Sequence, residues 1–244
     1  GHREPLDYDV LESTTVVYAF IAGPYPEVPR AYPAFLAAIY GLFGRSVTYV
    51  RAAQALFVGG GNTFRLKLHD AQDRVAELNR AAARVARQAA DAAGRPVLVA
   101  GSIGPTGEIL MPVGSLDPAE AKAAFRAQAE ALAEGGVDIL WIETMSSAEE
   151  LQAAVEAASG LGLPVCATMS FDTNGRTMMG LTPDAALSLA HQFVPPLAGF
   201  GANCGIGPAQ LLATLLGFSR FERQGEVIIA KGNCGIPEYR DGAI

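Results

Sequence analysis

From about residue 96 onward the chain repeats one pattern: a short apolar run, a turn rich in glycine or polar residues, and an Ala-rich amphipathic stretch with helical periodicity. Strands that alternate with helices in this way predict βα units and a parallel sheet. The runs are apolar at odd and even positions alike, which is typical of strands covered on both faces. The predicted strands span residues 96–100, 137–142, 164–169, 197–202 and 226–230.

Capping residues indicate where the helices between these runs begin. Asp117, Thr182 and Gly207 each precede a proline, which is favoured at the first position of a helix. Ser146 and Glu149 have the spacing of a capping box. We therefore predict that a helix starts after each of these four N-terminal markers.

The chain before this region holds one further helix and a segment without a readable βα unit. A single apolar face recurs at helical spacing between residues 70 and 93, formed by Val75, Leu78, Ala82 and Val85. Residues 55–60 are a degenerate apolar run that predicts a further strand, whereas prolines interrupt the segment before residue 57. The length of 244 residues is typical of a closed α/β barrel, so we predict one large domain. Because no βα unit is readable before about residue 57, we assign the barrel to residues 58–244 and an N-terminal segment to residues 1–57.

Composition excludes several classes of function. The formal net charge of −7 and the pI near 5.0 argue against a nucleic-acid binder, which needs clustered basic residues. The most apolar N-terminal run is too short to span a membrane and follows an acidic stretch, so neither insertion nor export is indicated. Three widely spaced cysteines do not form a disulfide framework, and they favour a reducing cytoplasm. Gly1 and His2 resemble a tag remnant and carry no fold argument.

Polar side chains gather where the predicted strands end. In parallel α/β folds the reactive groups collect at the carboxyl ends of the strands, and in a barrel they converge on one mouth. The residues at these positions are Ser102, Glu143, Ser170, Asp172, Asn203, Cys204, Asn233 and Cys234.

Several of these residues are compatible with more than one chemical role. Glu143 fits a general base, an anchor for a substrate ammonium, or a cap for the next helix. Cys204 fits a thiolate nucleophile, a metal ligand, or a small buried hydrophobe. Cys166 lies about 13 Å down its strand from the mouth and fits core packing. His69 and His191 are not at strand ends, so a Ser-His-Asp arrangement is poorly supported.

Six collinear stretches resemble the homocysteine S-methyltransferase family, closest to its bacterial betaine-homocysteine and methionine-synthase-like members. They are "RLKLHDAQDRVAELNRAA", "VAGSIGPTGE", "LWIETMSSAEE", "TMSFDTNGRTMMG", "GANCGIG" and "IIAKGNCGIPEYRDG". The resemblance implies a (β/α)8 TIM-type barrel in which zinc, held by three cysteine thiolates, binds the sulfur of homocysteine. The activated thiolate then attacks the methyl group of a small donor to give methionine. Zinc suits this chemistry because it stabilises a thiolate and leaves a fourth position for substrate.

The resemblance assigns roles residue by residue. Cys204 matches the first zinc ligand, Glu143 matches the acidic residue that holds the amino group of homocysteine, and Asn203 and Ser170 line that pocket. The family's other two ligands, an adjacent cysteine pair, have no counterpart here, and Cys234 is a weaker candidate for a second ligand. By this resemblance the five clear strands correspond to the third to seventh of the barrel. We therefore expect an incomplete barrel, with the first strand unmatched and the last strand absent.

Two functions follow as expectations. The first is a methyltransferase that uses homocysteine and a donor such as betaine, S-methylmethionine or methyl-folate delivered through cobalamin. The second is a non-catalytic truncated barrel or interaction domain that retains the fold without the complete zinc site. Two cysteines bind zinc more weakly than a three-ligand site, so we expect weak zinc binding and negligible homocysteine methylation despite a preserved pocket. An open barrel leaves strand edges exposed, which is compatible with a covering partner or a homo-oligomer.

Overall fold

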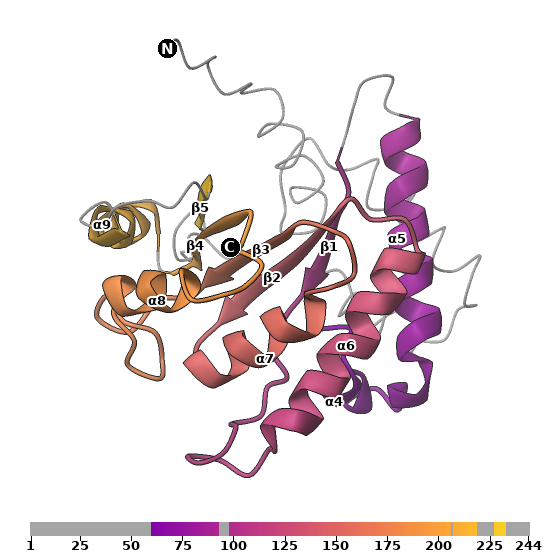
Figure 1. The fold of residues 1–244 in the computed structure, drawn as a ribbon, viewed down its shortest axis with the longest axis horizontal. Helices are drawn as coiled ribbons and strands as arrows, with labels where there is room; N and C mark the ends of the chain where they lie inside the picture. Colours follow the sequence, from indigo (N-terminus) through magenta and orange to yellow (C-terminus); the bar gives the residue numbers. More distant parts are fainter. Residues whose placement is uncertain (1–59, 93–97, 206, 219–226, 233–244) are drawn as a thin grey trace, which may run out of the picture.

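A computed structural model describes residues 60–92, 98–205, 207–218 and 227–232 (Figure 1). In these residues five parallel strands form one sheet in the order β1-β2-β3-β4-β5. The strands are β1 (Ala100–Ile103), β2 (Ile139–Met145), β3 (Val165–Met169), β4 (Gly199–Cys204) and β5 (Val227–Gly232). The predicted parallel α/β fold is confirmed. Residues 16–22, an apolar run that is a further candidate strand in the sequence, and nearly all of the run at 55–60 lie outside the described residues.

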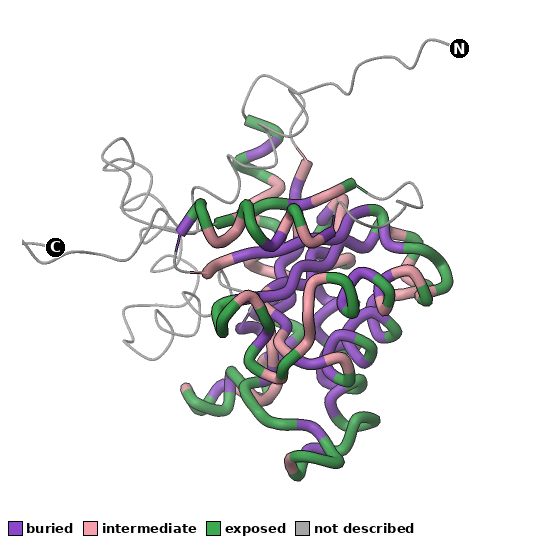
Figure 2. Tube along the Cα trace, turned by 90° about the vertical axis from the view of Figure 1, so that its left-hand side faces the viewer, coloured by how far each residue is buried: buried purple, intermediate pink, exposed green. Residues whose placement is uncertain are grey.

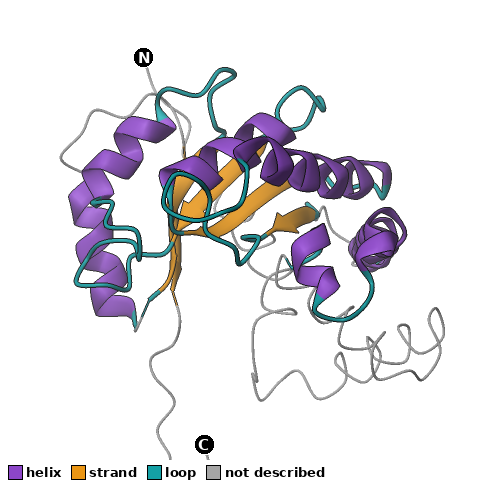
Figure 3. Cartoon of the chain, turned by 90° about the horizontal axis from the view of Figure 1, so that it is seen from below, coloured by secondary structure: helices purple, strands orange, loops and turns teal. Residues whose placement is uncertain are grey.

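Helices connect the strands and lie along one side of the sheet (Figures 1 and 3). Because each strand pairs with the next in sequence, right-handed crossovers place successive helices on the same face. This is the arrangement of a βα barrel, whereas a doubly wound sheet reverses its strand order. The helices are α4 (Thr63–Lys67), η1 (Gln72–Arg74), α5 (Val75–Asp91), α6 (Pro118–Glu134), α7 (Ala148–Ala158), α8 (Pro183–Ala190) and α9 (Pro208–Phe218). No described helix is long and apolar enough to cross a membrane.

The helix starts follow the predicted caps with one correction. The side chains of Asp117 and Thr182 accept backbone hydrogen bonds at the starts of α6 and α8, and α9 begins at Pro208. The cap of α7 is Ser147 rather than the predicted Ser146: its Oγ accepts a hydrogen bond of 3.1 Å from the Glu150 backbone N–H. The sequence SSAEE contains the capping-box spacing twice, so spacing alone does not distinguish the two serines.

The strands begin later than the apolar runs that predict them. The clearest case is β1, which starts at Ala100 rather than at residue 96. The backbone N–H of Val99 donates to the carboxylate of Asp138 at 2.6 Å, so it is not available to a sheet ladder. Regular pairing of β1 with β2 then starts at Ala100 and Ile139.

The strands of the sheet are largely buried (Figure 2), and apolar side chains cover both faces of the sheet. On the helix side, Leu140, Ile142 and Phe200 are fully buried in the main core. On the opposite face, Trp141, Cys166 and Ile229 pack together, which confirms Cys166 as a core residue. The main core is therefore the layer between the sheet and its helices.

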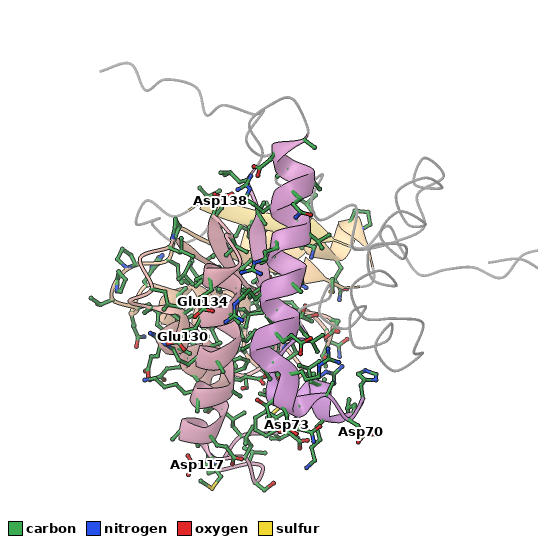
Figure 4. The ribbon with its side chains drawn as sticks, turned by 90° about the vertical axis from the view of Figure 1, so that its right-hand side faces the viewer. Asp70, Asp73, Asp117, Glu130, Glu134 and Asp138 are labelled. Atoms are coloured by element: carbon green, nitrogen blue, oxygen red, sulfur yellow. The ribbon has the colours of Figure 1, made fainter. Side chains whose placement is uncertain are left out.

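Helix α5 packs beside α6, and ion pairs link α5 to the end of α6 and to the segment between α6 and β2 (Figure 4). Arg80 pairs with Glu134, and Arg87 pairs with Asp138 at 2.8 Å. The predicted apolar face is correct at Val75 and Leu78, which are buried. In the next turns the buried residue is Ala83, whereas the predicted Ala82 and Val85 are only half-buried.

Candidate functional site

A layer of polar side chains lies on the inner face of the sheet, the face opposite the helices, near the carboxyl ends of the strands. Successive side chains of a strand alternate between faces, so residues two positions after the inner apolar cluster return to the same face. This rule extends the cluster of Trp141, Cys166 and Ile229 into a polar layer. Its members are Ser102 on β1, Glu143 on β2, Thr168 on β3, Asn203 on β4 and Lys231 on β5.

Glu143 is the buried charge of this layer, with 6% of its side chain exposed. Ser102 donates a hydrogen bond from its hydroxyl to Oε1, and Lys231 Nζ lies 2.6 Å from Oε2. Strands β2 and β5 are separated by two other strands, a distance of about 14 Å in a flat sheet. The contact between the two side chains therefore requires a sheet that curves toward its inner face, as in a barrel.

A β-bulge interrupts the pairing of β2 with β3 next to Glu143. The register between β2 and β3 shifts between Ile142 and Met145, and Thr144 adopts a φ of +64°. This left-handed conformation is rare for a β-branched residue. The backbone N–H of Thr144 donates to Asn203 Oδ1 at 2.9 Å, which stabilises the bulge. Bulges are common beside functional sites because they redirect a side chain.

Asn203 uses its whole hydrogen-bonding capacity within the protein. Its Oδ1 accepts from the Thr144 backbone and from Thr168 Oγ1 at 2.7 Å. Its Nδ2 donates to Thr144 Oγ1 at 2.8 Å and to Cys204 Sγ at 2.9 Å. An amide has two acceptor and two donor positions, so all four are filled. These contacts favour a positioning role, and direct binding of substrate by Asn203 stays a prediction.

Cys204 presents a partly exposed thiol at the end of β4, with a φ of +62°. This exposure excludes one of the three roles considered for Cys204 in the sequence analysis, that of a small buried hydrophobic residue. Among the residues that the structure describes, no group of three or more His, Cys, Asp or Glu side chains is placed to hold a metal. Cys234 and Asn233 lie outside these residues. One thiol of suitable chemistry does not make a tetrahedral site, so these residues alone do not account for a bound zinc.

The second described cysteine differs sharply from the first. Burial raises the pKa of the Cys166 thiol to about 11. A neutral thiol is a poor nucleophile and a poor metal ligand. Cys166 therefore belongs to the apolar layer beneath the site and not to its chemistry.

Ser170 directly follows β3 at the same edge of the sheet and is buried. Its hydroxyl donates to Asp172 at 3.4 Å, and its backbone N–H donates to the Met145 carbonyl at 3.1 Å. Among the described residues, no hydrogen bond joins Ser170 to Glu143 or Asn203. A common cavity lined by these three side chains stays a prediction.

Sequence reasoning missed Lys231 and assigned no role to Ser102 or Thr168. The apolar run that predicts β5 ends at Ala230, so the predicted strand stops one residue before Lys231. In the structure β5 continues to Gly232. Counting two residues from the inward-facing Ile229 would have placed Lys231 on the same face as Glu143.

Comparison with known proteins identifies relatives of the chain. Residues 49–243 match the family model described as homocysteine S-methyltransferase. The methionine synthase of Mycobacterium tuberculosis is 31% identical over 187 residues, and that of Mycobacterium leprae is 29% identical over the same length. Each alignment covers 73% of this chain but 15% of the relative, so the chain spans a small part of these synthases.

Solved structures show the same fold. The oxidized form of the homocysteine methyltransferase MmuM from Escherichia coli matches with a TM-score of 0.60 and 21% identity, covering 96% of this chain and 78% of that chain. The metallated form of MmuM matches with a TM-score of 0.58 and 19% identity, covering 96% and 86%. The structural likeness supports the barrel-type architecture that the strand order indicates.

Proposed function

The chain belongs to the homocysteine S-methyltransferase family, and from this premise we propose that it binds homocysteine and transfers a methyl group to the homocysteine sulfur, giving methionine. The observation that carries the proposal is the buried Glu143 carboxylate at the carboxyl ends of parallel strands, where an α/β barrel has its active site.

Glu143 is suited to bind the ammonium group of homocysteine. A carboxylate that is mostly removed from water interacts more strongly with a cation than an exposed one does. The hydroxyl of Ser102 holds one carboxylate oxygen, so the group has a defined orientation before substrate arrives. Preorganisation of this kind lowers the cost of binding.

Cys204 is proposed as one zinc ligand, with Cys234 as a weaker second candidate. When bound, zinc stabilises a thiolate at neutral pH and accepts the substrate sulfur at its open position. The described residues contribute to this site by fixing Cys204: Asn203 donates to its sulfur and is itself held by β2 and β3. The partners in the proposal are homocysteine and a small methyl donor, in the cytoplasm that the cysteine content predicts.

Methionine formation tests the proposal. The chain is incubated with excess zinc, because zinc binding is expected to be weak, with homocysteine, and with betaine, S-methylmethionine or methyl-cobalamin as donor. We expect methionine with at least one donor and a KM for homocysteine at least about tenfold higher in Glu143→Gln. Glu156→Gln, a change at an exposed carboxylate on α7, is the matched control and leaves KM unchanged.

Two other outcomes are informative. Homocysteine binding without methionine from any donor, at saturating zinc, would contradict methyl transfer and favour the non-catalytic domain of the sequence analysis. The absence of homocysteine binding would contradict the proposed function and leave the interaction domain as the alternative.

A further inference from the structure

Lys231 and Glu143 form an ion pair with unequal exposure. Lys231 Nζ lies 2.6 Å from Glu143 Oε2, and the exposed fractions of the two side chains are 30% and 6%. The lysine side chain is thus the more exposed partner of the pair, and the glutamate side chain is buried.

Two opposite charges at this spacing match the two charges of an α-amino acid. The ammonium and carboxylate of a free amino acid are attached to one carbon, so a receptor for both needs a cation and an anion side by side. We propose that Lys231 binds the α-carboxylate of the substrate while Glu143 binds its ammonium. This inference rests on the proposed function and makes Lys231 a determinant of specificity for amino-acid thiols.

The flexibility of lysine allows both contacts to form together. An ammonium has three donors on a four-carbon stem, so it can keep one hydrogen bond to Glu143 and direct another to a ligand carboxylate. Glu143 does not depend on Lys231 for its orientation, because Ser102 holds its other oxygen. When the substrate binds, the single ion pair becomes a cluster of two cations and two anions. They are Lys231, Glu143 and the ammonium and carboxylate of the substrate.

A purely structural role explains the pair less well. Enclosing two charges costs desolvation, and apolar residues of similar volume often stabilise a core equally well. The inner face directly below is apolar, formed by Trp141, Cys166 and Ile229. An apolar residue at position 231 would continue that layer.

The test compares three ligands. Homocysteine carries both charges, aminopropanethiol lacks the carboxylate, and mercaptobutanoate lacks the ammonium. Dissociation constants are measured by calorimetry for the wild-type chain and Lys231→Met at one fixed zinc concentration. Lys122→Met is the matched control, because Lys122 also pairs with a carboxylate at 2.6 Å, but on the outer helices.

We expect Lys231→Met to weaken homocysteine and mercaptobutanoate about 10- to 100-fold, the range for a hydrogen bond to a charged group. Aminopropanethiol should bind unchanged or more tightly, because Glu143 loses a competing cation. Lys231→Arg should restore much of the affinity for the two carboxylates, and Lys122→Met should change nothing.

Equal weakening of all three ligands would overturn the inference, because Lys231 would then only position Glu143. An unchanged set of constants would overturn it as well. If the wild-type chain binds no homocysteine, both the proposed function and the inference are contradicted. If it binds homocysteine with an affinity that Lys231→Met does not change, only the inference is contradicted. Should Lys231→Met not fold, Glu143→Gln/Lys231→Met removes both charges. Compared with Glu143→Gln alone, the double variant should lose further affinity only for the two ligands that carry a carboxylate.

Discussion

At the scale of single residues, Asn203 does the most to hold the site together. Its side-chain amide, which is 2% exposed, connects β4 to β2 and β3 through hydrogen bonds to Thr144 and Thr168. The same amide donates to Cys204. The left-handed conformation of Thr144 therefore depends on a side chain from another strand.

Replacing Asn203 by alanine is expected to lower the free energy of unfolding by about 2–4 kcal/mol. The cause is the loss of the acceptor for the buried Thr144 N–H and for the Thr168 hydroxyl. Urea denaturation measures the change. Gln152→Ala is the control, since Gln152 donates to Glu156 on the exposed surface of α7. A loss no larger than that of the control would contradict the assigned role.

The two described cysteines are expected to differ in reactivity. Because burial raises the pKa of Cys166 to about 11, roughly one thiol in a thousand is ionised near pH 8. Cys204 is more exposed and should be alkylated by iodoacetamide much faster. Peptide mapping by mass spectrometry follows each site separately, and Cys204→Ser should remove only the signal of that site. Alkylation of Cys166 at the rate of Cys204 would show that the inner layer is open.

At the scale of elements, the junction of β4 and β5 allows little substitution. Gly201 pairs with Ile229 in the parallel ladder. A Cβ at Gly201 would overlap the backbone of Ile229, including its nitrogen at 2.7 Å. The absence of a side chain at Gly201 is therefore what allows β5 to approach and to place Lys231 opposite Glu143.

Gly201→Ala is expected to destabilise the fold by about 2 kcal/mol or more, because backbone atoms must shift to relieve the overlap. Gly101→Ala is the matched substitution on β1. There the new Cβ meets side-chain atoms of Leu132 and Val137 at 3.2 Å, which can move by a few tenths of an ångström. Thermal or urea unfolding should therefore rank Gly101→Ala closer to wild type. The reverse ranking would contradict the pairing of β4 with β5.

The segment that follows β1 is attached to α7 by a buried carboxylate. Glu150 accepts hydrogen bonds from the Thr106 backbone at 2.8 Å and from its hydroxyl at 2.6 Å. Burial raises the pKa of Glu150 above its ordinary value of 4.5, and the bonds from Thr106 partly oppose the rise. The folded chain therefore binds this proton more tightly than the unfolded chain does.

This shift predicts how stability depends on pH. For a raised carboxyl pKa, the stabilising contribution is present below about pH 4.5 and is lost as pH rises through the folded-state pKa. Glu150→Gln cannot ionise and still offers an oxygen to Thr106. Its unfolding free energy relative to wild type should therefore increase as pH rises from about 4 to 8. Gln152→Ala, a change at an exposed residue of α7 that does not ionise, should show no such trend. A constant difference across this range would contradict the buried environment of Glu150.

Much of this organisation could be predicted from sequence, for identifiable reasons. Strands covered on both faces appear as apolar runs, so their order and parallel direction were correct. The runs do not show where hydrogen-bonded pairing begins, which at β1 depends on the Asp138 side chain. Lys231 was missed because a charged residue at the end of an inner face interrupts the apolar run. The bulge at Thr144 depends on Asn203, a residue from another strand, and no local pattern indicates it.

At the scale of the whole molecule, the site is defined by curvature. Sequential parallel strands, helices along one side, and a contact between Glu143 and Lys231 across two intervening strands describe an arc of a barrel. Below the polar layer lies the apolar cluster of Trp141, Cys166 and Ile229. The inner face is thus apolar at depth and polar at the carboxyl ends of the strands, where family members are expected to bind homocysteine.

Calorimetric titration of the chain with homocysteine tests whether this polar layer binds homocysteine through Glu143. We predict saturable binding that Glu143→Gln weakens at least about tenfold, because a charge-assisted contact to the ammonium is lost. Glu156→Gln, at an exposed carboxylate on α7, should bind homocysteine as the wild type does. Binding that is equally strong in Glu143→Gln and in the wild type would place the homocysteine site elsewhere and contradict the account.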